Sequence, residues 1–172
     1  MAQSPSPQQR PQWRLMRVSD LDDVVVIADA VHGPAYSEER PAFAERLALY
    51  PSGCRMLERD GTPLGYLISH PWHRATPPAL NEVLGAIPAD ADTFYLHDIA
   101  LLPATRGSGA GAEAVAHVVA CARAEALGEI GLIAVAGADS YWERQGFARL
   151  SPYPAYGPEC WLMRRIVEDD EA

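Results

Sequence analysis

A predicted strand, a glycine-rich loop and a predicted helix follow one another in the second half of the chain, and this succession constrains the fold most. The strand covers residues 93–102 and Pro103 stops it; the loop RGSGAG at 106–111 then leads into a helix over 112–127 that Gly128 ends. Glycines let backbone amides approach a ligand closely, and a helix N-terminus presents unpaired N–H groups to phosphate oxygens. The loop therefore predicts a phosphate site, with a simple turn as the alternative.

The same loop also fits a relaxed dinucleotide-binding pattern, G-x-G-x-x-A, through Gly107, Gly109 and Ala112. Two observations disfavour that interpretation. Residues 103–106 separate the strand from the first glycine, and no acidic residue directly follows the next strand, where a ribose-binding carboxylate is expected. A nucleotide-dependent oxidoreductase is therefore the least favoured class.

The remaining pattern predicts one α/β (α+β) domain around a mixed sheet. Asp60-Gly61 separates two strands as a hairpin turn, Gly33-Pro34 and Gly146 end helices, and residues 71–92 form a long connection with one short helix near 80–84. The expected strands cover residues 13–18, 54–59, 62–69, 93–102, 130–136, 147–150 and 160–167. The expected helices cover 19–32, 39–50, 112–127 and a short segment that begins with a Ser140–Glu143 capping box.

Charge and cysteine content exclude several classes of protein. The chain carries 14 Lys and Arg against 23 Asp and Glu, and the resulting net charge of −9 would repel nucleic acid. Its 3 cysteines are too scattered for a disulfide framework or a zinc site. No apolar run reaches the length of about 18 residues that a membrane span needs. We expect a cytoplasmic protein with a disordered tail at 1–12, one domain at 13–167 and an acidic tail at 168–172.

From about Arg14 to Arg165, the chain resembles the GNAT superfamily of acyl-CoA N-acyltransferases. The resemblance rests on the R-x-x-G-x-G signature at Arg106, Gly109 and Gly111, after the strand YLHDIAL, and on YWERQGF at 141–147, which is similar to the family's short helix ending in Gly-Phe. Two motifs in the correct order make the resemblance specific. It implies a GNAT-like fold: a mixed, mostly antiparallel sheet of about six or seven strands, splayed between strands four and five and flanked by about four helices.

The resemblance also implies acetyl-CoA as co-substrate. Its pyrophosphate would bind the amides of Arg106, Gly107, Ser108, Gly109, Ala110, Gly111 and Ala112. Its pantetheine arm would lie against Ile99, Ala100, Leu101 and Leu102, with the Leu101 amide as oxyanion donor. The family often protonates the leaving thiolate with a tyrosine, but that position holds Trp142 in this chain. Tyr141 beside it is therefore the candidate acid, and Trp142 is expected to contact the cofactor.

An acceptor amine is mostly protonated at neutral pH and must lose a proton before it attacks a thioester. Strand alternation predicts Tyr95 and His97 on one face of their strand and Asp98 on the other. His97 is the candidate base, with a buried structural histidine as the alternative, and Tyr95 lies near the position where some family members keep a glutamate. Asp98 either caps a loop or binds a cationic substrate.

The motif HPWH places His70, Trp72 and His73 at the end of a strand, where we expect them to line the acceptor pocket. A metal held by these two histidines and His97 is not expected, because their spacing fits no known zinc pattern.

The sequence thus predicts an N-acetyltransferase that moves an acetyl group from acetyl-CoA to a primary amine of a small molecule or peptide. We expect direct attack in a ternary complex, because no cysteine lies in the glycine-rich loop or on the strand before it. The alternative is a non-catalytic acyl-CoA-binding module, suggested by Trp142 in place of tyrosine. A homodimer is compatible with the sequence.

Overall fold

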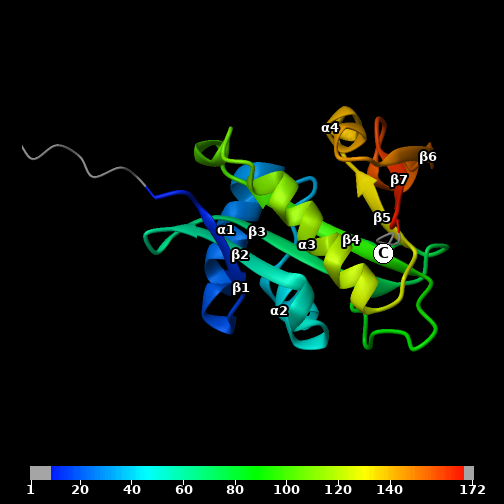
Figure 1. Ribbon diagram of the computed structural model, residues 1–172, viewed down its shortest axis with the longest axis horizontal. Helices are drawn as coiled ribbons and strands as arrows, with labels where there is room; N and C mark the ends of the chain where they lie inside the picture. Colours follow the sequence, from blue (N-terminus) through cyan, green and yellow to red (C-terminus); the bar gives the residue numbers. More distant parts are fainter. Residues whose placement is uncertain (1–8, 169–172) are drawn as a thin grey trace, which may run out of the picture.

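The computed structural model describes residues 9–168 (Figure 1). The strands are β1 (Gln12–Leu15), β2 (Cys54–Arg59), β3 (Thr62–Trp72), β4 (Thr93–Leu101), β5 (Glu129–Ala134), β6 (Ala148–Pro152) and β7 (Trp161–Ile166). The α-helices are α1 (Leu21–His32), α2 (Arg40–Leu49), α3 (Ala110–Ala124) and α4 (Asp139–Arg144). Among these described helices, none combines the length and the apolar character needed to cross a membrane.

The seven strands form one sheet in the order β1-β2-β3-β4-β5-β7-β6. Neighbouring strands are antiparallel except β4 and β5, which are parallel. The parallel pairing is short: it joins Phe94 to Ile130 and Tyr95 to Gly131, and beyond these pairs the two strands diverge (Figure 1). The predicted mixed, mostly antiparallel sheet, splayed between strands four and five, is confirmed.

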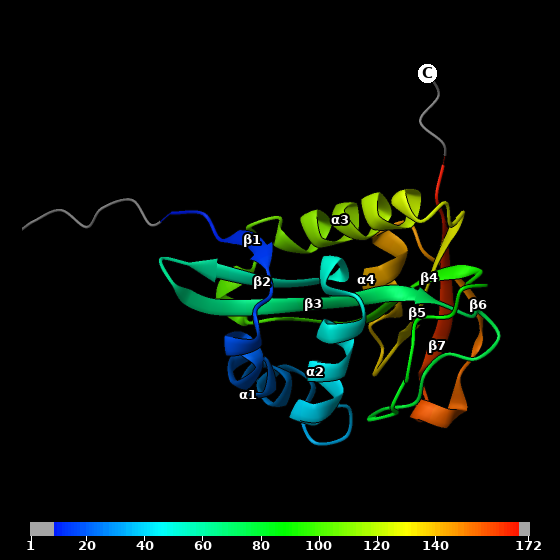
Figure 2. The same cartoon turned by 90° about the horizontal axis from the view of Figure 1, so that it is seen from below.

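Helices cover both faces of this sheet (Figure 2). α1 and α2 lie on one face, over a core that includes Val24 and Phe43. α3 lies on the other face with α4, over a core that includes Val118 and Trp142. Because both faces are covered, the central strands β3 and β4 are buried along most of their length.

Local turn signals in the sequence act as predicted at three positions. Asp60 and Gly61 have φ values of 51° and 76°, the left-handed conformations that a tight β2–β3 hairpin requires. Gly33, with φ of 67°, follows the last residue of α1, and Gly146, with φ of 86°, stands after α4. Glycine adopts these angles at little steric cost.

The ends of α3 differ from the prediction. The helix begins at Ala110, two residues earlier than expected, and ends at Ala124. Its last turn closes through hydrogen bonds from the Leu127 N–H to the Ala122 carbonyl (2.9 Å) and from the Ala126 N–H to the Arg123 carbonyl (3.0 Å). Ala126, with φ of 56°, therefore takes the left-handed position that the sequence assigned to Gly128.

Two other predicted features are wrong. No helix forms near residues 80–84 in the described chain, because Asn81 adopts a left-handed φ of 60° within a turn after two prolines. Ser140 lies inside α4 instead of capping it, since the N-cap is Ala138, two residues earlier than predicted.

The predicted tails fall mostly outside the described residues. Residues 1–8 of the expected N-terminal tail lie outside them, and Gln12 pairs with Glu58 in the β1–β2 ladder. In the expected acidic tail, only Glu168 is described.

Candidate active site

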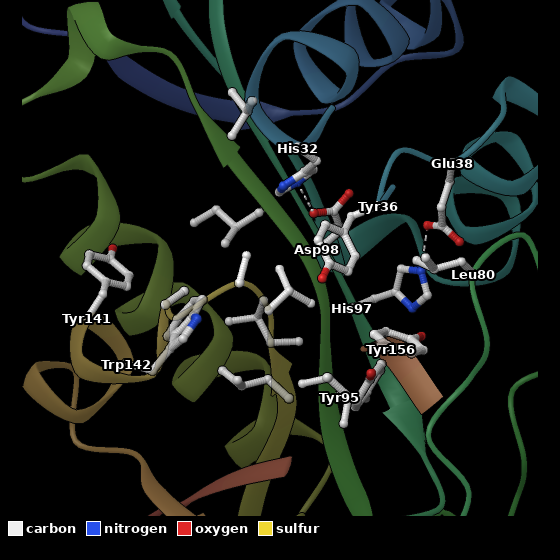
Figure 3. A pocket seen from close by; sticks show the side chains of 18 of the residues that line it. His32, Tyr36, Glu38, Leu80, Tyr95, His97, Asp98, Tyr141, Trp142 and Tyr156 are labelled. Carbon is white, nitrogen blue, oxygen red and sulfur yellow. Dashed lines mark hydrogen bonds and ion pairs between the residues drawn. The ribbon is translucent and has the colours of Figure 1, made fainter. Parts of the chain in front are cut away.

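The divergence of β4 and β5 opens a cavity of about 450 Å³ (Figure 3). One wall is β4, which contributes Tyr95, Leu96, His97, Asp98, Ile99 and Leu101. Facing walls come from the end of α1, from the loops around it and from α4, and contribute His32, Tyr36, Glu38, Leu80, Tyr141, Trp142 and Tyr156. Most of the site residues that the sequence predicted on β4 and α4 thus line one cavity.

A β-bulge at His97 decides how β4 faces this cavity. The register of β3 against β4 leaves His97 as an extra residue between Leu96 and Asp98. As a result, His97 and Asp98 both point toward the α1 side, where they contact Glu38 and His32 (Figure 3). The predicted placement of Asp98 on the opposite face is therefore wrong, because simple alternation fails across a bulge.

The first histidine–carboxylate pair joins His97 Nε2 to Glu38 Oε2 at 2.8 Å, and the two side chains are only 2% and 1% exposed. Glu38 also accepts a hydrogen bond from the Asn81 amide and lies 3.7 Å from Arg46. Burial would raise the pKa of Glu38, but the hydrogen bond and charge of His97 outweigh burial and lower it. His97 Nδ1 is buried and has no hydrogen-bond partner within the described residues.

The second pair joins His32 Nε2 to Asp98 Oδ1 at 2.7 Å. The other carboxylate oxygen, Oδ2, accepts a hydrogen bond of 2.5 Å from the hydroxyl of Tyr66. Burial would lower the pKa of His32, but the hydrogen bond and charge of Asp98 outweigh it, and that pKa is raised. Burial and the charge of Asp98 raise the pKa of Tyr66, so its phenol stays protonated and donates.

The glycine-rich loop forms a cradle of free amides at the start of α3. Gly107 and Gly109 have φ values of 75° and 81°, and Gly109 is the N-cap residue of the helix. The Ser108 hydroxyl bonds the Thr105 carbonyl. The amides of Gly109, Gly111 and Ala112 donate no hydrogen bond to any residue in the described part of the chain. Free amides at a helix N-terminus are a binding site for phosphate.

Tyr141 and Trp142 border the cavity on the side opposite the histidine–carboxylate pairs (Figure 3). Trp142 is 7% exposed and packs edge-to-face against Phe147, with ring centroids 5.4 Å apart. The hydroxyl of Tyr141 lies against the first turn of α3, because a Cβ added to Gly111 would be only 2.2 Å from it. Burial raises the pKa of Tyr141, which keeps the phenol protonated at neutral pH.

Some predicted site residues lie elsewhere. Ala100 and Leu102 pack into the core under α1 and α2, and neither lines the cavity. The HPWH residues are absent from the described cavity lining. His70 is buried within β3, and His73 lies 3.4 Å from Asp90 at the surface. Trp72, the last residue of β3, likewise lies outside the lining, and its indole N–H donates to the Thr76 carbonyl at 2.8 Å.

Among the polar residues of the cavity lining, the sequence did not identify four: His32, Tyr36, Glu38 and Tyr156. His32 carried a weak signal, since it precedes the helix-ending Gly33 and so had to lie at a turn of the chain. The other three lie in connecting segments, whose contacts depend on how distant parts of the chain pack.

The sheet thus opens between its two parallel strands, and free helix amides lie beside this opening. The chain belongs to the acetyltransferase (GNAT) family, whose model matches residues 21–147. The comparison with curated proteins gives no match.

Solved structures share the fold at low identity. They include the GphF GNAT-like decarboxylase in complex with isobutyryl-CoA (TM-score 0.76, 16% identity, covering 91% of this chain and 100% of that one). Another is the loading GNATL domain of CurA from Lyngbya majuscula (TM-score 0.79, 13% identity, 92% and 98% covered). A third is the ribosomal-protein-S18-alanine N-acetyltransferase from Escherichia coli (TM-score 0.62, 16% identity, 94% and 98% covered). At these identities the likeness establishes the fold alone.

Proposed function

We propose that the protein is an acetyl-CoA-dependent N-acetyltransferase that passes the acetyl group directly to a primary amine of a small molecule or peptide. One observation carries the proposal: the free amides at the start of α3 lie beside Tyr141 and Leu101, which line a cavity that also holds two histidine–carboxylate pairs. A phosphate-bearing acyl donor bound at these amides would thus extend toward groups able to take a proton. By analogy of fold, the isobutyryl-CoA complex of the GphF decarboxylase supports an acyl-CoA site, and the N-acetyltransferase from Escherichia coli supports transfer to an amine.

The acyl donor would enter along β4. Its pyrophosphate would accept hydrogen bonds from the free amides at the start of α3, assisted by the charge of Arg106. The Leu102 N–H donates to the Leu64 carbonyl in β3 at 2.9 Å, so by alternation the Leu101 N–H points toward the open side of the strand. There the Leu101 amide would stabilise the oxyanion that forms on the thioester carbonyl.

Direct attack is supported by the positions of the cysteines. Cys54, Cys121 and Cys160 are all buried, and none lines the cavity within residues 9–168. Burial raises the pKa of Cys54 to about 12, which keeps its thiol protonated and unreactive. A covalent acyl-enzyme therefore has no placed nucleophile.

Tyr141 is assigned to protonate the leaving thiolate. Because its hydroxyl lies at the Gly111 end of the cavity, the phenol has to turn along the cavity to reach the sulfur. Tyr141→Phe is expected to lower kcat by about 10–10⁴-fold while the affinity for acetyl-CoA changes little. Steady-state kinetics and calorimetry measure the two effects separately.

The matched control for this variant is Trp142→Phe. Trp142 has no acidic proton, so its loss should act through packing and reduce stability, or binding and turnover together. Full kcat in Tyr141→Phe would remove the tyrosine as acid, and weaker acetyl-CoA binding with unchanged kcat would make it a cofactor contact.

The function is tested by acetyl-CoA consumption over a panel of amino acids, polyamines, aminoglycosides and peptides. The net charge of −9 favours cationic acceptors, and we expect thiol release that depends on one class of amine. Binding of acetyl-CoA without turnover would instead favour a non-catalytic acyl-CoA-binding module. Loss of carbon dioxide from a carboxylated acyl-CoA without any amine would favour a decarboxylase.

A further inference from the structure

We propose that His32 is the catalytic base that takes the proton from the incoming amine, and that Asp98 and Tyr66 are its positioning residues. The inference rests on the proposed acetyl transfer and identifies a working part of the same site. His32 is the last residue of α1 and lines the cavity, although no motif in the sequence points to it.

The ring nitrogens of His32 are placed for proton uptake. Nε2 lies 2.7 Å from Asp98 Oδ1, so in the neutral imidazole the Nε2–H donates to the carboxylate and Nδ1 carries the lone pair. Nδ1 has no hydrogen-bond partner in the part of the chain that the structure describes. The side chain is 15% exposed in the cavity wall, so a substrate amine or a water molecule can reach it.

Asp98 is fixed through both of its oxygens. Oδ1 faces His32, and Oδ2 accepts the hydrogen bond from the buried Tyr66 hydroxyl. A carboxylate held in this way sets the tautomer and orientation of an imidazole and stabilises the imidazolium that forms after proton transfer. The β-bulge makes the arrangement possible, since it turns Asp98 toward α1.

The other titratable groups on β4 are less suited to this task. His97 has Nε2 engaged by Glu38 and Nδ1 buried, so neither nitrogen is open to the cavity. Burial raises the pKa of Tyr95 well above its ordinary value, so its phenol stays protonated and cannot accept a proton. His32 combines a free nitrogen with access to the cavity.

The reaction balances with His32 in this role. The ammonium group of the acceptor gives one proton to Nδ1 of neutral His32, and the freed nitrogen lone pair forms a bond with the thioester carbonyl carbon. The C–S bond then breaks, and the sulfur leaves with the electron pair. The sulfur takes a proton from the Tyr141 hydroxyl, and the second proton lost by the nitrogen restores that hydroxyl, which yields an amide and a free thiol. The His32 imidazolium finally returns its proton to solvent.

The surroundings of His32 determine where it titrates. The groups around it and its partner are Asp98 and His97 on β4, Tyr36 and Glu38 from the loop after α1, and Tyr66 on β3. Asp29, one turn earlier on α1, acts through its charge on Tyr66. The carboxylates outweigh burial and raise the pKa of His32 above 6.5. Neutral His32 is therefore lost as the pH falls through this raised pKa, and kcat/KM should rise with pH over the same interval.

The test is the pH profile of kcat/KM, measured with acetyl-CoA and the most active amine of the panel. His32→Gln is expected to lower kcat/KM by about 10²–10⁴-fold and to remove the acidic limb of the profile. Asp98→Asn should move that limb to lower pH, because the imidazolium loses its carboxylate. His117→Gln is the matched control on α3, outside the cavity lining, and should keep the parent profile.

A second measurement does not depend on turnover. NMR titration of the His32 ring protons should give a midpoint above 6.5 in the parent and a lower one in Asp98→Asn. If the parent transfers acetyl and the folded His32→Gln variant keeps the acidic limb of the profile, the assignment of the base alone is overturned. A parent that binds acetyl-CoA and transfers acetyl to no amine would overturn the proposed function and the base together.

Discussion

Gly109→Val is expected to weaken the binding of coenzyme A by about 10²–10⁴-fold, the equivalent of about 3–6 kcal/mol for two lost hydrogen bonds to charged phosphate. Gly109 has φ of 81° at the N-cap of α3, beside the free amides of Gly111 and Ala112. A branched side chain disfavours this φ, so the backbone would turn and redirect the amides. Calorimetric titration with coenzyme A measures the loss.

Gly85→Val is the matched control for backbone strain. Gly85 has φ of 76° with open space around it, and it lies in the long connection between β3 and β4. This variant should carry a similar conformational cost and keep the affinity of the parent. Parent-like affinity in Gly109→Val would contradict the pyrophosphate assignment, and equal losses in both variants would trace the effect to general destabilisation.

Acid is expected to destabilise the fold through His70. The side chain is 1% exposed, its Nδ1 lies 3.0 Å from the Pro71 carbonyl oxygen, and its Nε2 has no partner within the described residues. Burial, together with the charge of His97, lowers the pKa of His70 from 6.5 to about 3. The unfolded chain therefore binds this proton more readily than the folded one, and stability decreases as the pH falls below 6.5.

The expected size of this effect is about 1.4 kcal/mol per pH unit, or about 5 kcal/mol over the whole interval. A domain has a total stability of about 5–15 kcal/mol, so this one group is decisive in acid. Urea unfolding as a function of pH measures it, and His70→Gln should show a shallower decrease than the parent. The surface variant His73→Gln should follow the parent. Parallel curves for His70→Gln and the parent would show that His70 is not buried in its neutral form.

Much of the fold could be predicted because its signals are local. Asp60-Gly61 specifies a hairpin through backbone conformations that few other residue pairs adopt, and Gly33 and Gly146 end helices for the same reason. At the end of α3, where the glycine signal for the helix end was misplaced, backbone hydrogen bonds end the helix earlier. The hydrogen bonds of Ala126 and Leu127 close the helix before Gly128 is reached.

The site could be predicted only in part because its chemistry combines strand residues with loop residues. The sequence identified His97 and Asp98 on the strand that precedes the glycine-rich loop. That both side chains point in the same direction, however, depends on a bulge set by the register of β3 against β4. That register reflects packing along the whole sheet and leaves no mark in the residues themselves. Glu38 and His32 meet β4 only after α1 has folded against it, so no sequence spacing identifies them.

Initial rates measured over a matrix of acetyl-CoA and amine concentrations test direct acetyl transfer most decisively. A ternary complex without an acyl-enzyme predicts double-reciprocal lines that intersect, together with an acetylated amine formed in equal amount to free thiol. Parallel lines would require a covalent intermediate that the buried cysteines do not provide. Thiol release that is independent of the amine would contradict acetyl transfer itself.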